Sequence, residues 1–327
     1  MKRLYATFFI CVLMASFIIS FNKLHAEETY PVRPISFVIP MEAGADPDIL
    51  LRPWAEKVSK ILGQPIVIVN KPGGPQTIGY REVHGAKPDG YTFGACVATI
   101  FLAKMQGLFS YDLQDFTPLS LLVKTYPIIT ASKKTDHPFT TMQEVISYAK
   151  ANPGKIKAAT SARGAPSWLT SQLVQQATDV KFNIIPQEGV GSTIMSQVLG
   201  GHTDLGFAYM AAARAQIDAG TIRCLAVVGP DRFPGKYNNI PTLKEIGYDA
   251  GLVLWIGVIG PANMPKEITD KLVEAFQTAS QDTEIKNFWL SRNFFPGFLP
   301  STEFSDFADN QKKMFRDLLE EAGIKTK

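Results

Sequence analysis

Short apolar runs alternate with longer segments of helical periodicity along almost the whole chain. The runs are continuous and rich in β-branched residues, which predicts buried strands rather than half-exposed ones. The predicted strands are 35–40, 65–70, 90–98, 125–132, 155–161, 182–187, 203–210, 223–229 and 252–260. Because helical segments separate them, we predict an α/β fold built on mostly parallel sheets that helices cover.

Start and stop signals support the predicted helices. Asp46 precedes Pro47, which predicts an N-cap followed by proline in the first turn. Thr141 and Glu144 have the spacing of a capping box. Pro53 lies inside the first helix and predicts a kink there. Two further helices are predicted over 266–280 and from Ser301 to just before Gly323.

The first 26 residues have the layout of a secretory signal peptide. A basic start precedes an apolar run from Leu4 to Phe21, and a small residue, Ala26, ends the segment. The alternative is an uncleaved membrane anchor, because the run is near the length that spans a bilayer. No cysteine directly follows the run, which argues against a lipid anchor. We expect cleavage after residue 26 and export to the periplasm.

The remaining chain is neutral and large enough for two domains. The whole sequence has a formal charge of +3, but Lys2, Arg3 and Lys23 all lie in the leader. A neutral chain gives no reason to expect nucleic-acid binding. Cys96 and Cys224 are the cysteines outside the leader. They could pair, but a chain of this size needs no disulfide, and we favour two separate thiols.

Four turns rich in small residues follow predicted strands and lead into predicted helices. They are 40–48, 70–79, 161–167 and 186–193. Ligands of open α/β sheets bind beyond the carboxyl ends of the strands, so four such turns favour one shared cleft. The alternative is that the glycines only permit tight turns.

The order and spacing of several motifs resemble the Bug-type proteins, the extracytoplasmic receptors of tripartite tricarboxylate transporters. They include "YPVRPISFVIPMEAGADPDILLR", "KPDGYTFG", "YDLQDFTPLSLLV", "GVGSTIMSQVLGGHTDLGF" and "IPTLKEIGYDAGLVLWIGVIGPANMP". The resemblance implies a two-lobed periplasmic binding fold of type II-like organisation that closes on a small carboxylate. It also implies delivery to a permease of large and small membrane subunits, without a cofactor. We predict lobe 1 at 27–127 plus 252–327, lobe 2 at 128–251, and a monomer.

The resemblance also implies which turns hold the ligand. Transferred by position, the candidates of the first two turns are Met41, Glu42, Ala43, Gly44, Ala45, Asp46, Asp48, Asn70, Gly73, Gly74, Gln76 and Thr77. Those of the other two turns are Ser161, Arg163, Gly164, Ala165, Ser167, Gln187, Gly189, Val190 and Gly191. Cys96, Thr99 and Tyr209 follow strand ends and are expected to form walls, although such residues are equally often ordinary core.

Departures from the family pattern leave the ligand open. Met41 replaces an aromatic residue, and Glu188 replaces a cation. Asp46 and Asp48 suit a helix N-terminus without any ligand. Glu42 and Glu188 either face solvent, which favours a di- or tricarboxylate, or face the cleft. In the second case, with Arg163 as an anion partner rather than an exposed arginine, an amino-acid-like zwitterion fits better.

Enzyme motifs are missing from the sequence. There is neither a G-x-S-x-G elbow nor a P-loop, and no nucleophile stands beside a readable base. His84, His137 and His202 have no metal-ligand spacing, so we expect no catalytic and no metal site. The sequence therefore favours a solute-binding protein that feeds a transporter. The alternative is a sensor subunit of the same fold that signals to a membrane partner.

Overall fold

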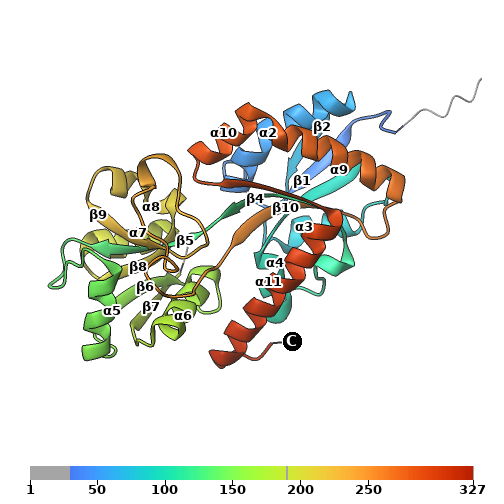
Figure 1. Cartoon of the computed structure of the whole chain (residues 1–327). Coiled ribbons are helices and arrows are strands. Elements are labelled where there is room, and N and C mark those ends of the chain that lie inside the picture. The colour runs from blue at the N-terminus through green and yellow to red at the C-terminus, as the bar shows by residue number, and fades with distance from the viewer. Residues whose placement is uncertain (1–29, 189–190, 327) are drawn as a thin grey trace, which may run out of the picture.

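The computed structural model describes residues 30–188 and 191–326, which form two sheets flanked by helices (Figure 1). The predicted signal peptide and the turn residues Gly189 and Val190 lie outside these ranges. Within them, no helix combines the length and the apolar character that crossing a membrane requires.

The first sheet has six strands in the order β11-β4-β10-β3-β1-β2. They are β1 (Ile35–Ile39), β2 (Ile66–Asn70), β3 (Thr92–Val97), β4 (Thr117–Thr125), β10 (Leu254–Gly260) and β11 (Phe295–Pro300). Strand β1 runs parallel to both β2 and β3. Strand β10 runs antiparallel to β3 and β4, and β11 runs antiparallel to β4.

The second sheet has five strands in the order β7-β6-β8-β5-β9. They are β5 (Pro127–Ser132), β6 (Lys157–Ser161), β7 (Asn183–Gln187), β8 (Leu205–Tyr209) and β9 (Ile222–Val227). Strand β6 is parallel to β7 and β8, whereas β5 is antiparallel to β8 and β9. The α/β prediction is thus confirmed, but the prediction of mostly parallel sheets is wrong, because the strands that carry the chain between the sheets run against their neighbours.

Helices cover both sheets. Around the first sheet lie α2 (Asp46–Leu62), α3 (Thr77–His84), α4 (Thr99–Met105), α9 (Lys266–Gln281), α10 (Thr283–Ser291) and α11 (Ser301–Glu321). Around the second lie α5 (Met142–Ala151), α6 (Pro166–Thr178), α7 (Gly191–Gly200) and α8 (Met210–Asp218). The capping box is confirmed, since Thr141 Oγ1 accepts the Glu144 N–H at 3.2 Å and the Glu144 carboxylate accepts the Thr141 N–H.

The N-cap prediction for Asp46 is wrong. Ala45 is the N-cap of α2, and no side chain caps this helix end. Asp46 already lies inside the first turn, which leaves its carboxylate free for other contacts. Pro53, at which the sequence predicts a kink, lies inside α2.

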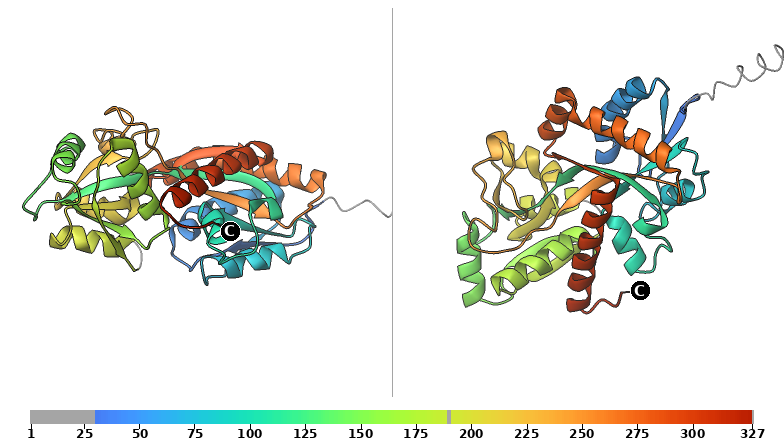
Figure 2. Two further views of the ribbon diagram at one scale, coloured as in Figure 1. Left: turned by 90° about the horizontal axis from the view of Figure 1, so that it is seen from below. Right: turned by 45° about the vertical axis from the view of Figure 1, so that its right-hand side comes forward.

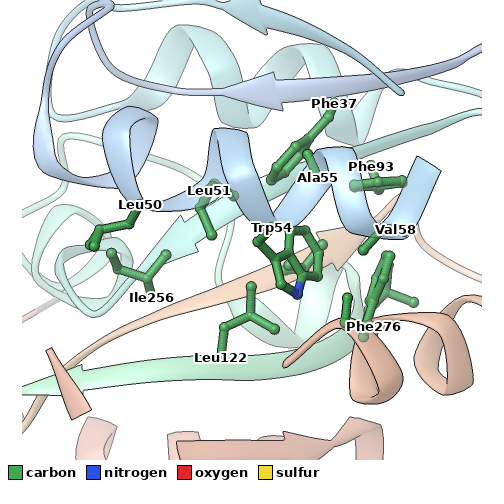
Figure 3. Packing of buried hydrophobic residues seen from close by; sticks show 14 of the residues in the cluster. Phe37, Leu50, Leu51, Trp54, Ala55, Val58, Phe93, Leu122, Ile256 and Phe276 are labelled. Carbon is green, nitrogen blue, oxygen red and sulfur yellow. The ribbon is translucent and has the colours of Figure 1, made fainter. Parts of the chain in front are cut away.

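An aromatic cluster fixes α2 on the first sheet (Figure 3). The Trp54 ring is fully buried, with centroids 5.9 Å from Phe37 of β1 and 4.9 Å from Phe276 of α9. Its indole N–H donates to Ser280 Oγ at 3.0 Å. These contacts hold α2, and with it the turn that precedes the helix, against the first sheet and α9.

The two connections between the sheets lie side by side. Strand β4 ends at Thr125 and β5 begins at Pro127, while β10 leads the chain back to the first sheet. Leu254 of β10 pairs with Thr125 of β4, so the two segments that connect the sheets, the passages, lie next to each other at this residue pair. Figure 2 shows the two halves from two further sides, with α11 of the first against α6 of the second. Cys96 and Cys224 are free thiols in different sheets, which confirms the prediction of separate thiols.

Candidate functional site

A cavity of about 240 Å³ opens where the two halves meet. Residues from the first half line it on one side, and Tyr209 and Ala211 from the second half line it on the other. Its polar wall consists of Asp46, Gln76, Thr99, Thr125, Tyr209, Trp255 and Asn293. The rest is apolar and consists of Met41, Pro47, Val97, Ala98, Ala211, Leu254, Ile256 and Phe294. No lysine or arginine is among these residues.

Asp48 organises the first turn instead of facing the cavity. It is 2% exposed and accepts the Gly44 N–H at 2.9 Å, while Arg52 donates to both of its oxygens. Asn70 Nδ2 donates to Asp48 Oδ1 at 2.9 Å and to the carbonyl of Met41 at 3.1 Å. Burial alone would raise the pKa of Asp48, but the hydrogen bonds from Arg52, Gly44 and Asn70 lower it on balance. These contacts lock the first turn to the end of β2.

Asp46 is the only carboxylate on the cavity wall in the part of the chain that the structure describes. Its side chain is exposed at the cavity edge, two residues before the buried Asp48. Loss of hydration raises the pKa of Asp46, and the positive charge of Arg292 opposes this effect. Asp46 thus makes one end of the cavity acidic.

The second turn lies against the first because α3 approaches it closely. A Cβ on Gly79 would be 2.7 Å from the backbone of Pro40, so only glycine fits there. Gln76 has a left-handed backbone with φ 63°, and its Oε1 accepts the Thr99 hydroxyl at 2.9 Å. Gln76 and Thr99 therefore form one polar part of the cavity wall.

The third turn contacts the first half of the protein outside the cavity. Arg163 donates to the carbonyl of Ala322, after α11, at 3.0 Å. Gln106, which follows α4, donates to the carbonyl of Gly164 at 3.1 Å. Ser161 and Ser167 hydrogen-bond to each other at 2.7 Å. This turn is a contact between the halves, and Arg163 contributes no cation to the cavity wall.

The fourth turn lies away from the cavity where the structure describes it. The Gln187 amide donates to the carbonyl of Ile185 in its own strand, and Glu188 is exposed. Gly191 starts α7 and lies close to Ala212. Gly189 and Val190 lie outside the described residues.

The cavity brings together five of the residues that the sequence nominated: Met41, Asp46, Gln76, Thr99 and Tyr209. The other described nominees do not line it; they are Glu42, Ala43, Gly44, Ala45, Asp48, Asn70, Gly73, Gly74, Thr77, Cys96, Ser161, Arg163, Gly164, Ala165, Ser167, Gln187 and Gly191. Cys96, for example, is fully buried beside Tyr80, and burial raises the pKa of its thiol.

Sequence reasoning missed the wall that β10 and the α10–β11 connection provide. Leu254, Trp255 and Ile256 come from β10, and Asn293 and Phe294 follow α10. Buried strand residues read as ordinary core in a sequence. Asn293 has a left-handed backbone (φ 64°). Its residue type is a weak sequence signal for this conformation, because asparagine tolerates it better than most residues.

Arg163→Ala should weaken ligand binding indirectly. The variant loses a hydrogen bond between the halves that is exposed to solvent, so we expect an affinity loss of roughly two- to fivefold. Small-angle scattering of the ligand-free variant should show a larger radius of gyration. Arg223→Ala is the control, because Arg223 donates to Pro138 within the same half. A loss above tenfold with unchanged scattering would instead place Arg163 in the ligand site.

Comparison with known proteins identifies similar chains over nearly the whole length. The family profile described as "Tripartite tricarboxylate transporter family receptor" matches residues 50–324. Protein BugT of Bordetella pertussis is 26% identical over 308 residues, which cover 92% of this chain and 92% of BugT.

Two solved structures show the same fold. A TctC solute-binding protein from Polaromonas has a TM-score of 0.79 and 27% identity, covering 90% of this chain and 100% of its own. An R. palustris protein with adipate has a TM-score of 0.75 and 25% identity, covering 90% of this chain and 99% of its own.

Proposed function

The chain belongs to the tripartite tricarboxylate transporter receptor family and is similar to a Bug protein, and from this premise we propose that it captures a small organic acid outside the cytoplasm. The family consists of substrate-binding receptors rather than enzymes. Its solved relatives include the periplasmic binding protein BugD and an R. palustris protein with adipate.

The cavity between the two halves is the observation that carries this proposal. Asp46 and Trp255 approach it from the first half and Tyr209 from the second. A ligand that touches both halves stabilises the closed arrangement through contacts that an open arrangement lacks. We infer closure about the passages at Thr125 and Leu254, with lobe boundaries at 127/128 and 251/252.

Two ligand chemistries are compatible with this wall. Adipate in a relative supports a plain diacid. Asp46 at one end favours an acid that also carries an amine, because a carboxylate beside it would be repelled. Glu42 and Glu188 are both exposed. The hypothesis of an amino-acid-like zwitterion as ligand therefore requires Asp46 to contact the amine of the ligand.

We further propose that the protein acts as a monomer in the periplasm after its signal peptide is removed. It would deliver the bound acid to a membrane transporter, as the family name implies, and the resemblance to Bug-type receptors implies that this permease has large and small subunits. This delivery would not involve nucleic acid or a cofactor.

A thermal-shift panel on refolded mature protein tests the proposal. Adipate, citrate, hexanoate and 6-aminohexanoate are compared at one ionic strength. A ligand at a hundredfold Kd should stabilise the protein by about 2.7 kcal/mol. Stabilisation by at least one acid supports the proposal. Lack of a shift with every acid at millimolar concentration, in protein whose fold is verified by circular dichroism, would contradict it.

Asp46→Asn should change which acid binds best. Removing the charge should weaken 6-aminohexanoate about tenfold and strengthen adipate several-fold, since a like-charge contact disappears. Calorimetric titration measures both affinities. Glu42→Gln is the matched control, because Glu42 is an exposed acid of the same turn outside the cavity wall. Equal effects of Asp46→Asn on both acids would show that Asp46 does not contact the ligand.

A further inference from the structure

Three residues of the cavity wall each carry a buried polar atom that makes no hydrogen bond within the described ranges. These groups are the Tyr209 hydroxyl, the Trp255 indole N–H and the Asn293 side-chain amide nitrogen. Trp255 is 2% exposed, Asn293 is 5% exposed, and Tyr209 is partly buried. The Thr170 hydroxyl lies near the Tyr209 hydroxyl but outside hydrogen-bond geometry, and it donates to the carbonyl of Pro166. The other unpartnered groups belong to Ser120, Thr203, Gln216, Thr269 and Gln311, and none of these residues lines the cavity.

All three groups can donate a hydrogen bond. An indole nitrogen and an amide nitrogen are donors only, and a phenol hydroxyl donates readily. Buried donors without acceptors carry a desolvation penalty that an incoming acceptor would remove. A cluster of neutral donors therefore selects an oxygen acceptor over a cation, and an ionised acceptor such as a carboxylate oxygen forms stronger hydrogen bonds than a neutral one.

The backbone brings these donors to the same passage between the halves. Leu254, which precedes Trp255, pairs with Thr125. Thr125 Oγ1 donates to the carbonyl of Asn293 at 3.3 Å. Tyr209 pairs with Pro127, two residues further on. Each donor thus lies within two residues of a contact to the segment from Thr125 to Pro127, the hinge segment.

The surrounding core holds the donors in place. The Trp255 ring packs with its centroid 5.1 Å from Phe304 and 5.9 Å from Phe101. Tyr209 is the N-cap residue of α8, where the chain leaves β8. Apolar wall residues such as Val97, Ile256 and Phe294 complete the lining. An occupant can therefore bury an apolar body against these residues.

We propose that Tyr209, Trp255 and Asn293 form a carboxylate-binding subsite at the hinge segment, which seats one acid group of a ligand with an apolar chain. The inference rests on the proposed function, because it names how the same cavity takes its ligand. A carboxylate bound there touches Tyr209 of one half and Trp255 and Asn293 of the other, and so links occupancy to closure.

Removing one donor while keeping its ring tests the subsite. Tyr209→Phe should lower the affinity for whichever of adipate, hexanoate and 6-aminohexanoate the wild-type protein binds, by about 10- to 100-fold. Trp255→Phe should lower it by a similar factor. The melting temperature of ligand-free Tyr209→Phe should equal or exceed that of the wild type, because an unsatisfied buried hydroxyl is gone.

Thr269→Val is the matched control. Thr269 also has an unpartnered buried hydroxyl, but it lies on α9 away from the cavity. This variant should keep the wild-type affinity. Hexylamine, which has the apolar chain and the amine without an acid group, should bind more weakly than 6-aminohexanoate and should bind the wild type and the two donor variants equally.

The outcomes separate the two proposals. Wild-type affinity in both Tyr209→Phe and Trp255→Phe would overturn the subsite and leave the proposed function intact. A lower melting temperature of ligand-free Tyr209→Phe would also overturn it, since the hydroxyl would then have a structural partner. Failure of the wild-type protein to bind any of the three acids would overturn the subsite, and failure to bind citrate as well would also overturn the proposed function.

Discussion

Asp48→Ala should lower the free energy of unfolding by about 3 kcal/mol, because it removes a buried carboxylate that several donors share. Gly44, Arg52 and Asn70 all donate to this side chain. Its loss leaves one of the two Asn70 amide protons without an acceptor, while the carbonyl of Met41 still accepts the other, and it removes the contact that holds the Gly44 N–H. Urea denaturation of the wild type and the variant measures the difference.

The contribution of Asp48 should depend on pH in a defined direction. The folded state lowers the pKa of Asp48 below its ordinary value of 3.8. The stabilisation is therefore fully present above that value and is lost as pH falls through the lower, folded-state pKa. The difference in stability between the wild type and Asp48→Asn should accordingly be constant from pH 7 to pH 5 and shrink below about pH 4.

Glu56→Ala is the control for a carboxylate on the same helix. Glu56 pairs with Lys60 at 2.8 Å, but both side chains are exposed, so we expect no measurable change in stability. A similar loss for Glu56→Ala and Asp48→Ala would mean that helix charge, rather than the buried network, stabilises the first turn.

Trp54→Ala should cost about 3–5 kcal/mol of unfolding free energy, the largest effect we expect from one substitution. The ring fills the space between β1, α2 and α9, and its removal leaves a cavity that rigid strands cannot close. The denaturation midpoint in urea, with the slope of the transition unchanged, is the measurement.

Two milder variants separate packing from hydrogen bonding at Trp54. Ser280→Ala leaves the indole N–H without its acceptor at a cost of about 1–3 kcal/mol. Trp54→Phe keeps an aromatic ring in the same place and should cost less than Trp54→Ala. If Trp54→Ala lost no more than Ser280→Ala, the hydrogen bond rather than the packing would dominate.

The sequence predicted most strands because buried strands appear in a sequence as continuous apolar runs. The run from Ile35 and the run from Ile66 both became strands of the first sheet. Strands β4 and β11 were not predicted as separate elements. Strand β11 contains two prolines and a glycine, a composition that opposes strand formation except at a sheet edge, and β11 is at the edge.

The pattern of apolar residues did not predict whether neighbouring strands run parallel or antiparallel. Parallel and antiparallel buried strands can share the same apolar composition, and only the path of the chain between the two sheets makes β10 antiparallel to β3. That path depends on contacts between residues far apart in sequence, such as Leu254 with Thr125.

By itself, the sequence determined the two-sheet α/β class, the family and the turn that carries Asp46, because local composition and motif order specify them. Only the tertiary structure separated Asp46, on the cavity wall, from Asp48, buried two residues later. Only the tertiary structure showed that Arg163 donates to the carbonyl of Ala322 and that Trp255 and Asn293 line the cavity. The physical reason is that a side chain's role depends on its neighbours in space, and at this site those neighbours come from distant segments of the chain.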